Sequence, residues 1–223
     1  MATVTALRRV PGRSRSGTGA LHGSVPSTST RVAVEVDGEP WVVLEEGDVL
    51  RLGLCAGLAV DDRLRERALA ASRTATATRR AGRLLARRPL ARADLEARLA
   101  PAAGPEAARA VVGRLEAIGV VDDRALATQL ADERLGRGFG PAAIHALLLQ
   151  RGVGEALAGE VVAELDAEAV LAAARVAAGG RTGAAGWRRL ASRGFDEDVA
   201  EAVLGAVVDD EQPGDDGAWG ESP

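Results

Sequence analysis

At 223 residues, with 47% hydrophobic but only 2% aromatic side chains, the chain is long enough for one elongated domain or two smaller ones. Ala, Leu, Arg and Glu are abundant, and because all four are good helix formers, they argue against a protein built mainly from β-sheets. The net charge of −4 hides a basic middle and an acidic tail, and no apolar run approaches the roughly 20 residues that span a membrane.

The N-terminal quarter of the sequence predicts two short segments. Residues 1–30 are rich in Ser, Thr, Gly and Pro and lack any apolar period, which predicts a disordered arm. Residues 31–60 predict a β-hairpin around Asp37-Gly38, followed by a short helix that ends near Gly53. A lone hairpin is only marginally stable, so it must pack on the helices or on a partner.

The rest of the chain predicts helices in groups of three. A helix from Asp61 to about Arg88, with an aspartate N-cap, begins the series. An apolar signature at i, i+3, i+4 and i+7 then recurs from Ala108, Ala158 and Ala200, at a spacing typical of helical repeats. We therefore expect an all-α, elongated solenoid of three tandem three-helix repeats after the hairpin. The repeats are expected at 61–119, 120–166 and 167–208, followed by an acidic disordered tail at 209–223.

Three candidate sites have plain structural interpretations. Asp122 and Asp123 are neighbours on a helix start, where their side chains diverge, so helix capping is favoured over metal binding. His145 and the single cysteine, Cys55, lie in no catalytic motif. The sequence therefore predicts a binding protein, not an enzyme, with no cofactor and no small-molecule substrate. One cysteine also excludes an intrachain disulfide and suits a reducing compartment, so we expect a cytoplasmic location.

Arginine clusters are the remaining functional signal. One group covers the end of the first long helix, and a smaller group lies in the third repeat; their members are Arg80, Arg83, Arg87, Arg88, Arg188, Arg189 and Arg193. These side chains could simply be a solvated surface. The alternative interpretation is contact with nucleic acid or with an acidic protein groove.

Several segments carry distinctive motifs. An Arg-Pro step at Arg88-Pro89 precedes Asp94-Leu95 and Leu99, and the segment 115–127 surrounds a paired aspartate, Asp122-Asp123. These motifs resemble those of the RecX family of RecA regulators. Further similarity lies at 140–144, 148–153 and 190–195, so the resemblance covers about 31–207. It departs from the family at Leu126, where an aromatic residue is usual.

The resemblance implies a regulator of recombination, DNA repair and the SOS response. Such a protein binds the RecA–single-strand DNA filament and inhibits its recombinase, ATPase and coprotease activities. The expected partners are therefore RecA and single- or double-strand DNA, with no membrane. An alternative is an autonomous nucleic-acid-binding helical repeat protein, which steep salt dependence on bare DNA would favour.

Overall fold

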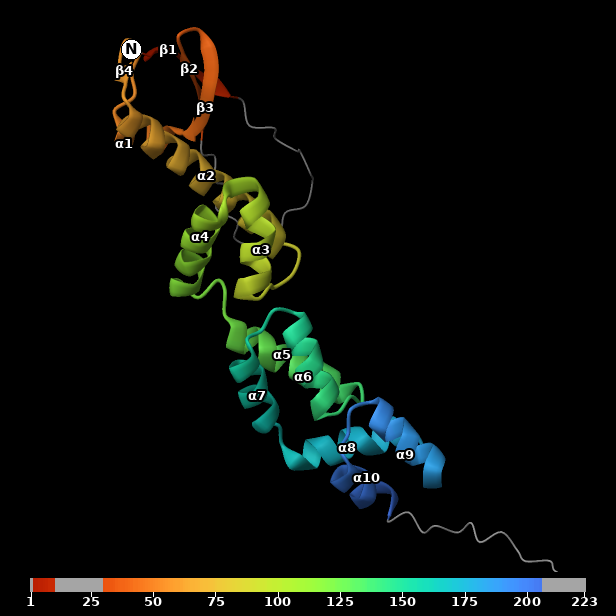
Figure 1. Cartoon of the computed structure of the whole chain (residues 1–223). Coiled ribbons are helices and arrows are strands. Elements are labelled where there is room, and N and C mark those ends of the chain that lie inside the picture. The colour runs from red at the N-terminus through yellow and green to blue at the C-terminus, as the bar shows by residue number, and fades with distance from the viewer. Residues whose placement is uncertain (1, 11–29, 206–223) are drawn as a thin grey trace, which may run out of the picture. The chain divides into compact units, whose positions relative to one another are not determined.

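A computed structural model describes residues 2–10 and 30–205 as a mostly helical protein with a small N-terminal sheet (Figure 1). The chain divides into two units, residues 1–123 and 124–223. The first unit holds the sheet and the helices α1 to α4, and the second holds the helices that follow. Among the described residues, no helix is long and apolar enough to span a bilayer.

The predicted hairpin is confirmed. Strand β2 (Arg31–Val36) pairs antiparallel with β3 (Glu39–Glu45), with Val34 opposite Val42. Asp37 and Gly38 both have positive φ, at 51° and 86°, as a tight hairpin turn requires. The hairpin does not stand alone, because β3 packs against α2.

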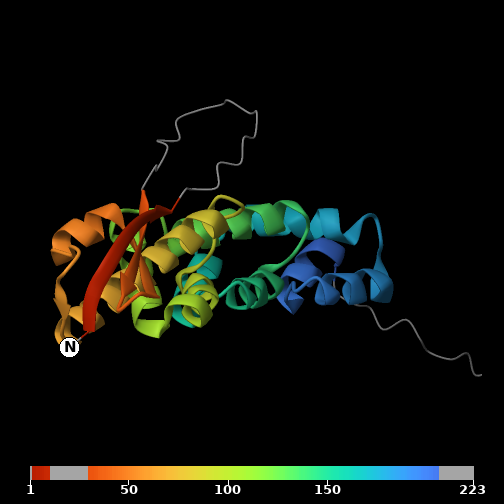
Figure 2. The same ribbon diagram turned by 90° about the horizontal axis from the view of Figure 1, so that it is seen from above.

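The expectation of a disordered arm at residues 1–30 is wrong for residues 2–10. Residues Ala2–Val10 form strand β1, which pairs with β2 and with the short strand β4 (Ala59–Val60), giving the sheet order β3-β2-β1-β4. Figure 2 shows β1 in red lying against the orange hairpin. A register shift between Val4 and Ala6 breaks the simple alternation that would have predicted this strand. Residues 11–29 lie outside the described part of the chain.

The next two elements join the sheet to the helices of the first unit. Helix α1 (Glu46–Leu52) ends at Gly53, which takes the left-handed conformation, as expected. Helix α2 (Asp62–Leu85) begins at Asp61, whose carboxylate accepts a hydrogen bond from the backbone N–H of Leu64 at 2.7 Å. This N-cap was predicted, but the helix ends three residues earlier than expected.

Helices α3 (Arg92–Ala103) and α4 (Pro105–Ala117) pack on each other and on α2. Their core includes Leu95, Leu99 and Val112, none of which has any exposed surface. Proline at the first position of α4 is favourable because the first N–H groups of a helix have no partner within it.

The second unit consists of short helices. In chain order they are α5 (Asp123–Gly136), α6 (Pro141–Gln150), α7 (Glu155–Ala163), α8 (Ala167–Ala178), α9 (Gly183–Ser192) and α10 (Glu197–Leu204). Helices α5 and α8 begin near 120 and 167, where the sequence predicts the second and third groups of three helices to start. The acidic tail expected at 209–223 lies outside the described residues.

The repeated apolar signature is only partly buried. Ala108, Ala158 and Ala200 are at most 3% exposed, so the first position of each copy faces a core. Val112 is also fully buried, whereas Val162 and Leu204 are half-buried. These three residues occupy the same place in the three copies of the signature, which predicts equivalent core positions. That prediction is wrong, because the later helices are shorter and cover less surface.

Two loops meet within the second unit and fix the position of α6. The backbone N–H of Gly140 donates to the carbonyl of Arg193 at 2.8 Å, and that of Ala142 donates to Gly194 at 3.1 Å. The loop before α6 is thereby held against the turn between α9 and α10, although 54 residues separate Gly140 from Gly194.

Candidate functional site: arginine surfaces and a pocket

The arginines at the end of α2 differ in how firmly the fold holds them. Arg83 and Arg87 are exposed, and among the described residues neither forms an ion pair or a hydrogen bond through its side chain. Arg88 lies 3.8 Å from the Asp94 carboxylate. Arg80 is half-buried, and its Nε is enclosed without an acceptor in the described part of the chain. The face expected to present all four to a partner therefore exposes Arg83 and Arg87 most freely.

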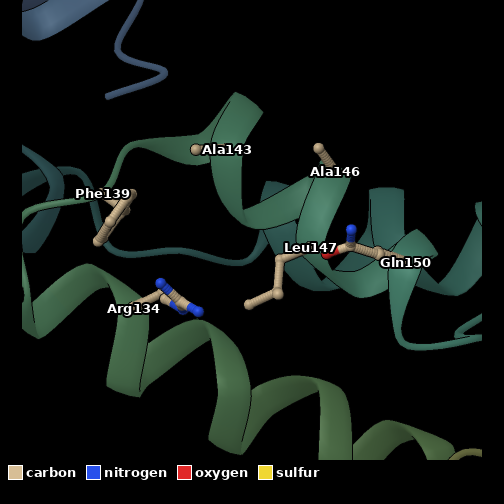
Figure 3. A pocket seen from close by; sticks show the side chains of 6 residues that line it. All are labelled: Arg134, Phe139, Ala143, Ala146, Leu147 and Gln150. Carbon is tan, nitrogen blue, oxygen red and sulfur yellow. The ribbon is translucent and has the colours of Figure 1, made fainter. Parts of the chain in front are cut away.

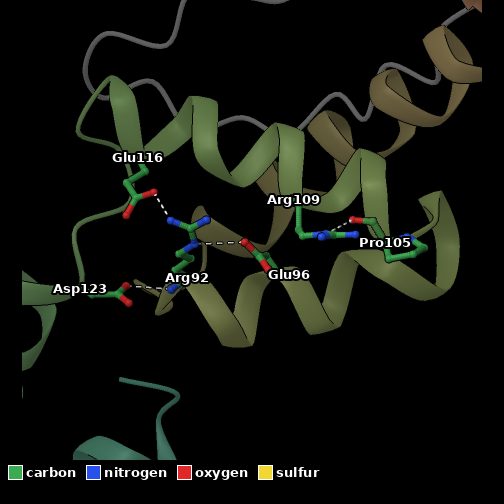
Figure 4. Close-up of polar contacts among 6 residues, drawn as sticks. All are labelled: Arg92, Glu96, Pro105, Arg109, Glu116 and Asp123. Carbon is green, nitrogen blue, oxygen red and sulfur yellow. Dashed lines mark hydrogen bonds and ion pairs between the residues drawn. The ribbon is translucent and has the colours of Figure 1, made fainter. Parts of the chain in front are cut away.

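Neighbouring arginines form ion pairs within the first unit. The guanidinium of Arg79 pairs with the Glu45 carboxylate at the end of β3. Figure 4 shows Arg92 at the start of α3, where its guanidinium contacts Glu116 at 2.6 Å and Glu96 at 3.2 Å. The backbone N–H of Arg92 also donates to Asp123 at 2.8 Å. These pairs tie successive elements of the first unit together.

Asp123 is one of the paired aspartates considered as a metal site. Burial raises the pKa of its carboxyl above the ordinary 3.8, and the nearby charges of Glu116 and Asp122 raise it further. The hydrogen bond from Arg92 acts in the opposite direction. The role of Asp123 in the first unit is therefore to accept a hydrogen bond at the start of α3, a contact that sequence spacing could not predict.

A charged groove in the first unit was not predicted. It has a volume of about 900 Å³ and lies along α1 and α2. Its charged lining residues are Glu45, Asp48, Arg51, Arg67, Arg79 and Arg114. Asp48 is 8% exposed and pairs with Arg51, so part of this charge is already neutralised.

The arginines of α9 are also unequal. Arg188 is exposed, and its side chain has no polar partner among the described residues. Arg189 donates weakly to the carbonyl of Ala177 at 3.4 Å. Arg193 lies over the ring of Phe139, 4.4 Å from its centroid, and Arg134 lies 5.0 Å from the same centroid. The α9 group thus combines Arg188, which has no polar partner in the described part of the chain, with Arg193, which stacks on an aromatic ring.

Phe139 borders an open pocket between α5 and α6. This pocket, called the Phe139 pocket below, has a volume of about 400 Å³. It is lined by Arg134, Phe139, Ala143, Ala146, Leu147 and Gln150. Figure 3 shows Arg134 reaching from α5 toward Phe139, and Leu147 pointing from α6 toward α5. An apolar cavity with a cation at its rim suits an apolar side chain that carries negative charge beside it. Local sequence patterns could not predict this pocket, because its lining comes from two helices and a loop.

The other residues considered have ordinary surroundings. The Nε2 atom of His145 lies 3.4 Å from the Glu155 carboxylate, and Cys55 is exposed. Among the residues that the structure describes, no three His, Cys, Asp or Glu side chains gather as metal ligands would.

Comparison with known proteins gives a consistent result. No protein-family model matches the chain. Two curated relatives, each named regulatory protein RecX and from two strains of Thermus thermophilus, are 44% identical over 118 residues. The match covers 53% of this chain and 82% of each relative.

Solved structures support the fold. A crystal structure of regulatory protein RecX matches with a TM-score of 0.63 and 18% identity, over 91% of this chain and 98% of that one. A crystal structure of RecX from Lactobacillus salivarius matches with a TM-score of 0.54 and 13% identity, over 59% of this chain and 94% of that one.

Proposed function

The chain belongs to the RecX family of regulatory proteins, and from this premise we propose that it binds the RecA–single-strand DNA filament and inhibits its ATPase, recombinase and coprotease activities. The protein acts by binding, without a cofactor, in the compartment where the filament forms. The family relationship supports the identity of the partner. The binding surface is inferred from Arg83 and Arg87, whose guanidinium groups are exposed and have no ion pair or hydrogen bond among the described residues.

The contact is electrostatic. Guanidinium groups bind phosphate and carboxylate in a bidentate manner, and they do so most readily where no internal acid already holds them. Within the described residues, Arg83, Arg87 and Arg188 meet this condition. The other arginines of the two predicted groups are held by their own unit and are less available to a partner. They are Arg80, Arg88, Arg189 and Arg193.

Repetition of the helices supports contact at several points. We assign α2–α4, α5–α7 and α8–α10 to three repeats, at 61–119, 120–166 and 167–208, because the same apolar residue is buried in the last helix of each. Repeats of this kind present successive similar surfaces to an extended partner. Several weak contacts then add to avidity without one strong site.

The decisive test is RecA ATPase on single-strand DNA, titrated with the intact chain and with Arg83→Glu/Arg87→Glu. The matched control is Arg63→Glu/Arg73→Glu, which makes the same charge change at two other exposed positions of α2. Inhibition should weaken in the first variant and persist in the control. It should also fall as salt rises, because salt screens contacts between exposed charges.

A third variant, Arg188→Glu, tests the second unit. A single substitution is preferable to removal of α8, because Gly138 lies against the backbone of Ala173 and Ala177 in that helix, and truncation would uncover this contact. Equal inhibition by all folded variants would place the binding surface elsewhere. Binding to bare DNA with steep salt dependence and no effect on RecA would instead favour an autonomous nucleic-acid-binding protein.

A further inference from the structure

We propose that the acidic segment around Trp219 binds in the Phe139 pocket of its own chain, where it covers the two arginines stacked on the Phe139 ring. The proposal concerns an internal contact of the second unit and does not depend on the partner proposed above. It follows from the chemistry of the pocket, the composition of the chain beyond the last helix, and the distance between them.

The pocket specifies what can occupy it. Phe139, Ala143, Ala146 and Leu147 provide apolar walls, and the volume of about 400 Å³ lies in the range that small ligands fill. Arg134 and Arg193 both face the Phe139 ring. Among the described residues, neither forms an ion pair with a carboxylate. A fitting occupant therefore has a flat apolar group with acidic residues beside it.

The end of the chain has this composition. Trp219 is preceded by Asp215 and Asp216 and followed by Glu221, and no Arg occurs after Arg193. Indole rings pack well against aromatic and aliphatic side chains, and carboxylates at either side can pair with guanidinium groups. The charges of the segment and of the pocket rim are thus opposite.

The segment is also close enough to reach the pocket. The turn between α9 and α10 touches the pocket wall, because a β carbon on Gly194 would lie 2.7 Å from the β carbon of Ala143. From that turn, the eight residues of α10 extend about 12 Å at 1.5 Å per residue. Gly205 ends the described chain, and the 14 residues from there to Trp219 can extend about 46 Å at 3.3 Å each. The tether is therefore several times longer than the path back along α10.

Tethering favours this occupant over a separate molecule. A segment held by a short connection has an effective concentration in the millimolar range, so a weak individual contact is still occupied. The consequence is that an acidic or aromatic segment of another protein must displace Trp219 before it can enter the pocket.

The test uses the full chain labelled with 5-fluorotryptophan. It gives one fluorine signal each for Trp41, Trp187 and Trp219, and loss of a signal in Trp219→Phe assigns the last one. The measurement is the change in each signal's position between H2O and D2O, which reports exposure to solvent. For Trp219, the difference in signal position between H2O and D2O should be much smaller in the folded chain than in the urea-unfolded chain. Concentrated salt should increase this difference, because it weakens the contact between carboxylates and guanidinium groups.

Two variants of α6 sharpen the result. Leu147→Glu places a charge in the pocket and should make Trp219 fully exposed to solvent. Leu149→Glu, on the same helix but outside the pocket lining, should leave Trp219 unchanged. The Trp187 signal from α9 reports in the same spectrum whether each variant is folded. As a second route, Asp215→Asn/Asp216→Asn alters only the segment itself and should increase the exposure of Trp219.

Three outcomes would overturn the proposal. One is a Trp219 signal as exposed in the folded chain as in urea. Another is a protected signal that responds equally to Leu147→Glu and Leu149→Glu, which would place Trp219 elsewhere. The third is protection that disappears on dilution, because the occupant would then be the segment of a second copy and not that of the same chain.

Discussion

Gly140 and Gly194 meet backbone to backbone, so that a β carbon on Gly140 would lie 2.4 Å from the carbonyl oxygen of Gly194. A β carbon on Gly194 would in turn lie 2.4 Å from the backbone nitrogen of Ala143. Gly194 also has a φ of +81°, a conformation that side chains disfavour. The contact holds the start of α6, and with it the wall of the Phe139 pocket, against the turn after α9.

We expect Gly140→Ala and Gly194→Ala each to lower the free energy of unfolding by about 1–3 kcal/mol, because rigid backbone must move to admit the methyl group. Urea titration followed by circular dichroism measures this. Gly159→Ala is the matched control, since Gly159 lies in α7 with open space around its Cα. That change should stabilise the protein by about 0.5–1 kcal/mol through helix propensity. Equal effects of all three changes would refute the close contact.

Strand β1 should be needed for folding of the first unit. Val4 is 1% exposed, so Val4→Ala should cost about 1–3 kcal/mol in unfolding free energy, and deletion of residues 2–10 should cost more. The sequence alone predicts a disordered arm at residues 1–30, whose removal would leave folding unchanged, so this outcome would reverse that expectation. The control Arg8→Ala removes an exposed pair with Glu35 and should change stability by less than about 1 kcal/mol. Unchanged thermal unfolding of the deletion would contradict the pairing of β1.

Two leucines of the second unit should contribute differently to the free energy of unfolding. Leu190 is fully buried in α9, and Leu190→Ala should destabilise the chain by about 2–5 kcal/mol. Leu204 is half-buried beside Gly186, so Leu204→Ala should cost only about 1–2 kcal/mol. Chemical denaturation of both variants gives the comparison. A larger effect at Leu204 than at Leu190 would mean that the tail-side end of α10 is more deeply covered than the described residues indicate.

Asp123 should make stability depend on pH. Because the pKa of its carboxyl is raised in the folded state, the folded chain binds this proton more tightly than the unfolded chain. The charged form is therefore unfavourable above the raised pKa, and the penalty disappears as pH falls to the ordinary 3.8. Asp123→Asn keeps an oxygen to accept from Arg92 and should be more stable than the original chain at neutral pH. This gain should vanish below about pH 4; Asp132→Asn, at an exposed position, is the control.

Local signals predicted most of the helices. Asp61 caps α2 and Gly53 ends α1 because each needs only its immediate neighbours to do so. Strand β1 was missed for two reasons. Its alternation is broken near Val4, and the Ser- and Gly-rich residues after it obscure the pattern. The hairpin could be predicted because its turn lies between its own strands, whereas β1 depends on partners far along the chain.

The candidate site was less predictable than the fold. Arg80, Arg83 and Arg87 recur three and four residues apart, as on one face of a helix, yet Arg80 is half-buried, Arg83 is exposed on α2, and Arg87 is exposed beyond the end of that helix. Spacing gives the direction of a side chain on its helix but not what packs against it. The Phe139 pocket and the meeting of Gly140 with Gly194 likewise join residues distant in sequence, and local sequence patterns hold no record of such contacts.

The sheet order β3-β2-β1-β4 has a consequence for folding during synthesis. Ala2 pairs with Val60, so the first strand to leave the ribosome cannot complete its pairing until the last one has followed. At roughly 5–20 residues per second this interval is on the order of 3–10 seconds, whereas a hairpin such as β2–β3 closes in about 1–10 μs. During that interval, the buried edge of β1 is available to chaperones or to a neighbouring nascent chain. Slower translation before Asp62 would lengthen this exposure, and the yield of folded protein should reflect it.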